Sequence, residues 1–218
     1  MHKRQIHVDF TEFGSYNQDK MSSTFSELAC KLFHSNQKSL YNSTRSMWQK
    51  NAVTPLSGKE VKYLLICEAP PSTGKYFYSG KNSTFLTNVW KAFFNDKLLD
   101  LSLVYKDLAD EGFLLVDTLP YAMNYSTPNN TRGTQAYDYL ISACRNWWID
   151  ELDKNFKFAC PNELKIAFGF RKNAISILKG PKQITLNGLQ YVLPAKIAEG
   201  MYLPTSESLR STFPIISS

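Results

Sequence analysis

The sequence predicts an α/β protein, namely a three-layer α/β/α domain around a central, mainly parallel, four-stranded sheet. Short apolar runs are each followed by polar or turn-forming residues, which is typical of strands buried on both faces of a parallel sheet. Between these runs lie segments whose apolar residues recur at helical spacing. Alternation of strands with helices favours a layered fold in which helices cover both faces of one sheet.

The length and composition set the first limits. The 218 residues suffice for one domain with a sizeable core, and 43% hydrophobic with 20% charged residues excludes wholesale disorder. No window approaches the ~18 consecutive apolar residues of a membrane helix, and the first nine residues lack the apolar region of a signal peptide. We therefore expect a monomer without membrane association, located in the cytoplasm and nucleoid-associated, or in the nucleus of a eukaryote.

The N-terminal part, residues 1–60, is predicted to be an arm and a helix packed on the domain. Residues 1–22 are polar and show no period. The helix is expected over 24–34, where Phe25, Leu28 and Leu32 share one face and Thr24 with Glu27 forms a capping box. Residues 35–60 are rich in Ser, Asn and Lys and predict a surface connection, with Trp48 as its only large anchor.

Residues 61–218 are predicted to form the core domain. The four apolar runs that predict strands are 61–67, 112–116, 164–168 and 200–203. Apolar stripes predict helices over 84–94, 134–152 and 172–178, the last ended by Gly180-Pro181. Residues 182–198 add a small strand or hairpin. Ligands of open α/β sheets bind beyond the carboxyl ends of the strands, so the loops that begin at Glu68, Asp117, Gly169 and Pro204 are where we expect a site.

The charge balance permits a polyanionic partner. Lys and Arg number 25 against 19 Asp and Glu, a net charge of +6, and 14% of the residues are aromatic. The four cysteines, Cys30, Cys67, Cys144 and Cys160, form no C-x-x-C pair, so we expect free thiols rather than a zinc ribbon or a disulfide framework. Ser72-Thr73-Gly74-Lys75 lacks the first glycine and the last Ser or Thr of a phosphate-binding P-loop, which excludes that motif.

The four loops together resemble the uracil-DNA glycosylase superfamily, over roughly residues 61–213. Leu64 to Pro71, with Glu68-Ala69-Pro70 at its centre, is similar to the G-E-A-P-G loop of the branch that usually carries an iron–sulphur cluster. Phe113 to Thr118 is similar to the strand that ends in the base-recognising Asn, and Ile166 to Ala174 to a W-G-x-x-A junction. Tyr202 to Arg210 is similar to the M-P-S-S-S-A-R loop of the mismatch-specific thymine/uracil branch.

Three departures change what the resemblance implies. The cysteine spacing of the cluster-bearing branch is absent, so we expect no iron–sulphur cluster, no metal and no cofactor. Leu203 stands where many members carry a histidine that donates to the pyrimidine, and none of the three histidines is near a motif. Asp117 stands where the family has Asn. An ionised carboxylate only accepts hydrogen bonds, whereas a protonated one also donates. Asp117 therefore favours cytosine, or cytosine modified at C5 as in some foreign or viral DNA, over uracil.

The resemblance implies a monofunctional DNA glycosylase that flips a base out of DNA, hydrolyses its N-glycosidic bond and leaves an abasic site. It implies catalytic roles for Glu68, which would orient or deprotonate water, and for Asp117. The base would stack on Phe77. Further contacts are expected to the base from Ala69, Pro70, Asp117 and Tyr121, and to DNA from Lys75, Lys81, Thr205, Ser206, Ser208 and Arg210.

Alternatives remain open at this point. Each of these residues also has a structural interpretation: Phe77 as a core ring, Glu68 as a carboxylate bound to turn amides, Asp117 as a strand-end residue, and the Ser/Thr cluster as a helix cap. The alternative functions are a uracil or mismatch repair glycosylase, a nucleoside N-glycosidase and a non-catalytic sensor of modified bases.

Overall fold

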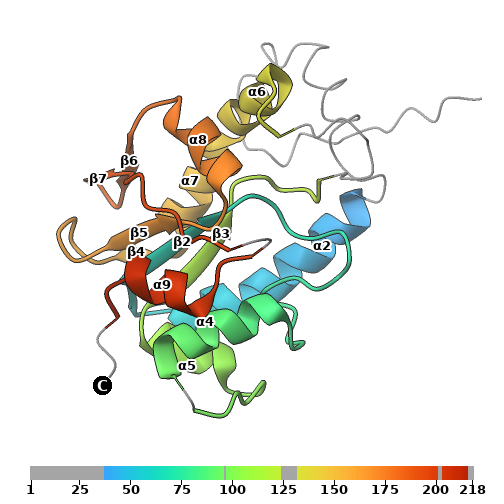
Figure 1. Ribbon diagram of the computed structural model, residues 1–218, viewed down its shortest axis with the longest axis vertical. Helices are drawn as coiled ribbons and strands as arrows, with labels where there is room; N and C mark the ends of the chain where they lie inside the picture. The colour runs from blue at the N-terminus through green and yellow to red at the C-terminus, as the bar shows by residue number, and fades with distance from the viewer. Residues whose placement is uncertain (1–36, 96, 124–131, 201–202, 216–218) are drawn as a thin grey trace, which may run out of the picture.

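The computed structural model describes residues 37–95, 97–123, 132–200 and 203–215, and it has the predicted mixed α/β class (Figure 1). Its centre is a parallel three-stranded sheet in the order β3-β2-β5. The strands are β2 (Tyr63–Cys67), β3 (Phe113–Asp117) and β5 (Lys165–Phe168). Nearly every residue in them is buried, as expected for runs of Leu, Ile, Val and Phe covered on both faces.

The predicted four-stranded sheet is not formed by the described residues. Gly200 and Leu203 are not in a strand, and residues 201–202 lie outside the described part of the chain. Instead, Ile197 forms a single parallel bridge with Phe168, and Ala198 N donates to the Phe168 carbonyl. Ala198 is buried beside β5 whereas Gly200 offers no side chain to pack, which explains why the contact lies before the predicted run.

Two smaller sheets accompany the central one. The predicted strand over 61–67 divides, because β1 (Glu60–Val61) pairs in parallel with β4 (Lys157–Phe158), a strand that the sequence analysis did not predict. The hairpin expected within 182–198 is confirmed as β6 (Gln183–Leu186) and β7 (Leu189–Val192).

The helices of the core follow the predicted stripes. The prediction of a helix over 84–94 is confirmed by α4 (Thr84–Phe94). The segment 134–152 forms two helices, α6 (Gln135–Ala143) and α7 (Arg145–Asn155), which meet at Cys144. The third predicted helix is α8 (Arg171–Leu178). The short helix α5 (Val104–Asp110) was not predicted, whereas α9 (Ser206–Thr212) begins at the Ser/Thr cluster that was interpreted as a helix cap.

The prediction of a surface connection over 35–60 is wrong. This segment is helical, with α2 (Gln37–Trp48), a π-helical stretch (Gln49–Val53) and α3 (Thr54–Leu56). The segment is mostly polar, but Trp48, Ala52 and Leu56 recur every four residues and form one sparse apolar stripe. All three side chains are buried. The arm over 1–22 and the helix over 24–34 lie outside the described residues.

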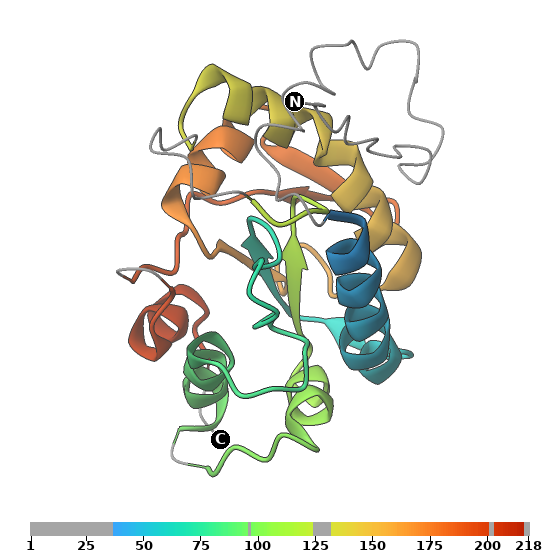
Figure 2. The ribbon, with the colours of Figure 1, turned by 90° about the vertical axis from the view of Figure 1, so that its right-hand side faces the viewer.

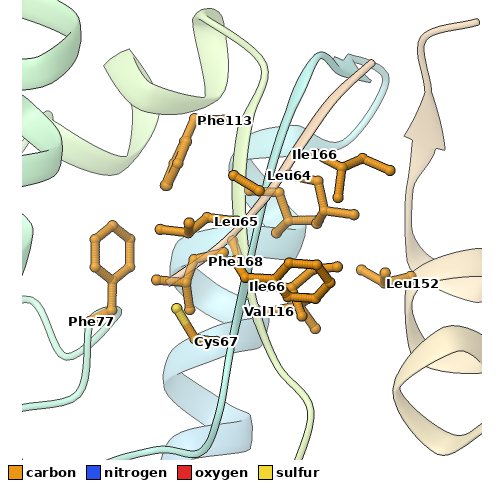
Figure 3. Close-up of a cluster of buried hydrophobic side chains, with 14 of the residues drawn as sticks. Leu64, Leu65, Ile66, Cys67, Phe77, Phe113, Val116, Leu152, Ile166 and Phe168 are labelled. Carbon is orange, nitrogen blue, oxygen red and sulfur yellow. The ribbon is translucent and has the colours of Figure 1, made fainter. Parts of the chain in front are cut away.

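Helices cover both faces of the central sheet, which forms the middle of three layers (Figure 2). Phe93 of α4 packs edge-on against Tyr63 of β2 and Phe113 of β3, with ring centroids 5.2 Å apart in each case. Phe213, directly after α9, contacts the same Tyr63. On the opposite side lies Leu152 of α7, as Figure 3 shows. None of the helices in the described ranges is long and apolar enough to span a membrane.

Candidate active site

A pocket of about 880 Å³ opens at the carboxyl ends of β2 and β3. Its walls come from the loops that follow these strands, from the polar face of α4, and from Phe170 and Leu203. This is the edge of an α/β sheet where ligands bind, as the sequence predicted. The residues that line the pocket include Cys67, Glu68, Ala69, Lys75, Phe77, Phe85, Lys91, Asp117 and Arg132.

Asp117 ends β3 directly beside Cys67, its partner in the parallel register with β2. Its carboxyl group makes no hydrogen bond or ion pair with any described residue. Burial, together with the nearby Glu68 charge, raises the pKa of Asp117 to about 8. A large fraction of the Asp117 side chains is therefore protonated at neutral pH. A protonated carboxyl both donates and accepts hydrogen bonds, so Asp117 presents two complementary groups to a ligand in the pocket.

Glu68, the first residue after β2, is only 2% exposed and is held by two side chains. Arg132 donates from Nε to Oε1 at 2.7 Å and from Nη2 to Oε2 at 2.5 Å, and the Tyr137 hydroxyl donates to Oε1 at 2.6 Å. A bidentate guanidinium–carboxylate pair of this kind fixes the orientation of both groups. The Tyr137 pKa is strongly raised by burial and by the Glu68 charge, so its hydroxyl remains a donor.

A second set of hydrogen bonds joins the loops after β2 and β3. Thr118 N donates to the Cys67 carbonyl at 3.0 Å, Leu119 N donates to the Glu68 carbonyl at 2.9 Å, and the Thr118 hydroxyl lies within reach of both carbonyls. Asn173 of α8 donates to Thr118 Oγ1 at 3.0 Å and faces the Tyr137 hydroxyl at 3.5 Å. The two acids are therefore positioned by a rigid, buried polar framework rather than by solvent-exposed loops.

Phe77 lies in the pocket wall but is mainly a core ring. It is 4% exposed, and its ring contacts those of Tyr78, Phe85, Tyr105 and Phe113 at centroid distances from 4.8 to 6.2 Å. The half-buried rings of Phe85 and Phe170, which the sequence analysis did not assign to the site, also line the pocket. These two rings offer more accessible stacking surface for a planar base than Phe77 does.

The other residues predicted to bind the base divide between two places. Ala69 lines the pocket. Pro70 is buried on the other side of the loop, where it faces Trp48 of α2 across a small cavity. Tyr121 packs its ring against Tyr41 of α2 at 5.4 Å and is not among the residues that line the pocket. The structure therefore places Pro70 and Tyr121 outside the main pocket, although Pro70 and Asp117 line the same small cavity.

The predicted DNA-binding lysines differ in their positions. Lys75 is exposed and lines the pocket, whereas Lys81 is exposed outside it. Lys91 of α4, which the sequence analysis did not single out, lines the pocket as well. The rim of the pocket thus carries three cationic side chains, those of Lys75, Lys91 and Arg132.

The predicted contacts from the last loop are engaged in local structure. Thr205 is the N-cap of α9 and accepts from Ser208 N at 3.2 Å. Ser206 donates to Glu207 at 2.9 Å, and Ser208 accepts from Glu199 N. Arg210 donates to the Lys91 carbonyl at 2.6 Å and so links α9 to α4. In this arrangement the cluster caps and anchors α9 beside the pocket.

Arg132, Tyr137 and Asn173 carry the buried network, yet only Asn173 stands in a motif that the sequence analysis quoted. Arg132 and Tyr137 lie outside those motifs, and only the folding of the chain brings them to Glu68. The described residues contain no group of three His, Cys, Asp or Glu side chains placed to hold a metal ion. The arrangement therefore offers acid–base chemistry, hydrogen bonding and one fixed guanidinium.

Comparisons with models of known protein families, with curated proteins and with solved structures found no match to this chain.

Proposed function

We propose that this protein is a monofunctional DNA glycosylase that takes an extruded, cytosine-derived base into the pocket at the carboxyl ends of β2 and β3. The observation that carries the proposal is Asp117, a half-buried carboxyl that lines the pocket, has a pKa of about 8 and makes no bond to any described residue. Holding such a group without a partner is costly for the fold. A ligand that forms hydrogen bonds with the carboxyl would offset this cost. Groups in clefts whose pKa values are strongly shifted are candidates for functional sites.

The Watson–Crick edge of cytosine fits this carboxyl. The protonated carboxyl donates to N3 of the ring and accepts from the 4-amino group, which makes two hydrogen bonds. Because N3 of cytosine is basic, the same two bonds form if the proton moves onto the base. Uracil also makes two hydrogen bonds to a protonated Asp117, since the carboxyl donates to O4 and accepts from N3–H. Its edge has no basic atom, however, whereas N3 of cytosine shares and retains the proton of the pair, and this difference favours cytosine.

The size of the pocket supports a modified base. A volume of about 880 Å³ is within the range of pockets that hold ligands much larger than one pyrimidine ring. Unmodified cytosine is everywhere in a host genome, so its excision would be toxic. A cytosine that carries a substituent at C5, as some foreign or viral DNA does, meets both constraints. The half-buried rings of Phe85 and Phe170 line the same space and are suited to stack on a flipped base.

The reaction is hydrolysis of the N-glycosidic bond. Glu68 contributes a negative charge beside the sugar, which favours the cationic character that develops at C1′, and its loop orients the attacking water. Lys75, Lys91 and Arg132 around the rim attract the phosphates of the strand. Water is the nucleophile, and the products are the free base and an abasic site.

The test is excision from duplexes that each carry a single uracil, cytosine, 5-methylcytosine or 5-hydroxymethylcytosine, with strand cleavage measured after alkali. We expect release of a cytosine-derived base and no cleavage without alkali. Glu68→Gln is expected to abolish release while duplex binding is retained, which distinguishes an enzyme from a sensor of modified bases. Release of uracil alone would refute the cytosine assignment, and release from free nucleosides but from no duplex would refute a DNA substrate.

A further inference from the structure

One wall of the main pocket is a polar stripe on α4. Polar residues of this helix recur at helical spacing and so share one face. Those that line the pocket are Thr84, Thr87, Asn88 and Lys91. The opposite face of α4 is apolar and buried in the core. From Thr84 to Lys91 the stripe extends for about 10 Å along the helix axis. It is therefore a long, mostly neutral wall of the same space that Asp117 lines at the end of β3.

The pocket has room for more than a base. Its volume of about 880 Å³ is near the upper end of the range of small-molecule pockets, which hold drug-sized ligands. A single pyrimidine ring beside Glu68 and Asp117 fills only part of this volume. The pocket then still has space along the α4 stripe, in whose middle stand the half-buried Thr87 and Asn88. A substrate that fills the pocket therefore carries an additional group.

The stripe is suited to hydroxyl groups rather than to phosphates. Asn88 donates from Nδ2 to the Pro204 carbonyl at 2.8 Å, and Thr87 donates from Oγ1 to Asn82 Oδ1 at 2.9 Å. Each of these two side chains is thereby left with an oxygen that accepts. A phosphate offers only acceptor oxygens, which such atoms repel, whereas a hydroxyl group donates as well as accepts. Both side chains are neutral, and the cation of the stripe, Lys91, is exposed at its far end.

These two side chains are also held in place before a ligand arrives. The hydrogen bonds to Pro204 and Asn82 keep each of them in one orientation. They stand on a helix whose Phe93 packs against the central sheet. Groups that are already ordered lose little conformational entropy when they engage a ligand. The stripe is thus preorganised for a neutral group with several hydroxyls.

We infer that the α4 stripe binds a neutral, hydroxyl-rich substituent of the base, such as a hexose joined through a 5-hydroxymethyl group, with Thr87 and Asn88 as its binding residues. This inference rests on the proposed function and specifies its substrate class. The bond that breaks is still the C1′–N1 bond of the nucleotide. The hydroxyl of the attacking water joins C1′, the electron pair of the broken bond stays with the base, and the base takes up a proton. The base leaves with its substituent intact.

The experiment compares two duplexes that differ only in this substituent. One carries a single 5-hydroxymethylcytosine, and the other carries the same base with a glucose on its hydroxymethyl oxygen, in either anomeric form. The glucose adds hydroxyls but no charge, so the phosphate contacts of the two duplexes are the same. Single-turnover release is measured below saturation for wild type, Thr87→Val, Thr87→Phe and the control Thr185→Phe. Thr185 is an exposed threonine of β6 outside the pocket. Thermal unfolding followed by circular dichroism verifies that each variant is folded.

We expect wild type to release the glucosylated base about 10-fold faster than the unglucosylated one, the effect of one or two additional neutral hydrogen bonds. Thr87→Val should lower this preference about 5-fold, because one of these bonds is lost. Thr87→Phe should abolish the preference, because its ring occupies the space of the sugar, and Thr185→Phe should retain it.

Faster or equal release of the unglucosylated base by wild type would overturn the inference and leave the proposed function standing. Equal losses on both duplexes in the Thr87 variants would overturn it as well, since they would show that the stripe contacts the DNA strand rather than the substituent. If wild type releases no base from these duplexes or from those that carry uracil, cytosine or 5-methylcytosine, the proposed function itself fails.

Discussion

At the scale of single residues, Asp117 shows how a residue of the candidate site can lower the stability of the folded protein. It ends a buried strand in the expected register, but nothing in the described chain bonds to its carboxyl group. Its pKa is raised to about 8 because burial and the Glu68 charge disfavour the ionised form. From about pH 4 to about pH 8 the folded protein therefore binds a proton that the unfolded chain releases, and the wild-type free energy of unfolding falls as the pH rises through this window.

Asp117→Asn removes this dependence. At pH 7.5 the variant should be more stable than wild type by about 5 kcal/mol, or roughly 10–20 °C in Tm for a chain of this length. Near pH 3 the two proteins should be equally stable, because the carboxyl is then neutral in the folded state and largely neutral in the unfolded state. Thermal unfolding followed by circular dichroism across this pH range measures both effects. Glu163→Gln, an exposed carboxyl far from the pocket, should show no such gain, and a similar gain there would contradict the explanation.

At the scale of elements, the turn into β3 requires glycine at position 112, at the end of the strand opposite to the site. Gly112 has φ +78°, and a Cβ there would lie 2.7 Å from the Glu60 carbonyl oxygen. The Gly112 carbonyl also accepts from Lys62 N and Tyr63 N at the start of β2. Two independent constraints, a left-handed backbone and a close approach, therefore require glycine at this position.

Gly112→Ala should destabilise the protein by about 3 kcal/mol, the sum of the left-handed backbone strain and the displacement of β1. The matched control is Gly188→Ala in the β6–β7 turn, where φ is +77° but nothing lies within 4 Å of the new methyl group. That variant should lose only about 1 kcal/mol. Urea unfolding of both variants provides the comparison, and equal losses would show that the contact with Glu60 does not matter.

At the scale of the whole molecule, part of the positive charge that gives the chain its net +6 lies around the pocket. Lys75, Lys91 and Arg132 border the pocket, and Glu68 and Asp117 lie inside this basic rim. The sheet separates the pocket from the face covered by α7. A polyanion that binds over the pocket would therefore contact α4 and the loop after β2, and would leave α7 uncovered.

Lys91→Ala should weaken binding to a DNA duplex and make the plot of log K against log salt shallower by about 0.9, the effect of losing one phosphate contact. Lys154→Ala, an exposed lysine on α7, should change neither quantity. Fluorescence anisotropy titrations from about 50 to about 200 mM salt measure the slopes. The same slope for Lys91→Ala and wild type would place the DNA elsewhere on the molecule.

Much of the fold was predictable because the hydrophobic patterns along the chain agree with which residues are buried in the structure. The three runs that became β2, β3 and β5 are short, apolar and followed by polar residues, and α4 was predicted to the residue from its apolar stripe. In the structure Ser83 caps this helix. The prediction over 35–60 failed because only three anchors spaced four residues apart mark the helical face. The expected strand over 200–203 failed because pairing with β5 is decided by packing of Ile197 and Ala198 rather than by a longer apolar run.

The sequence by itself determined that polar groups follow the buried strands, and so it placed Glu68 and Asp117 at one edge of the sheet. Parallel strands end at the same edge, which makes this inference local and robust. Only the tertiary structure decided that Arg132 and Tyr137 clamp Glu68, because these contacts join residues more than 60 positions apart in the chain. It also decided that Asp117 is left without such a clamp. Long-range contacts of this kind depend on how the helices pack on the sheet, which no spacing along the chain records.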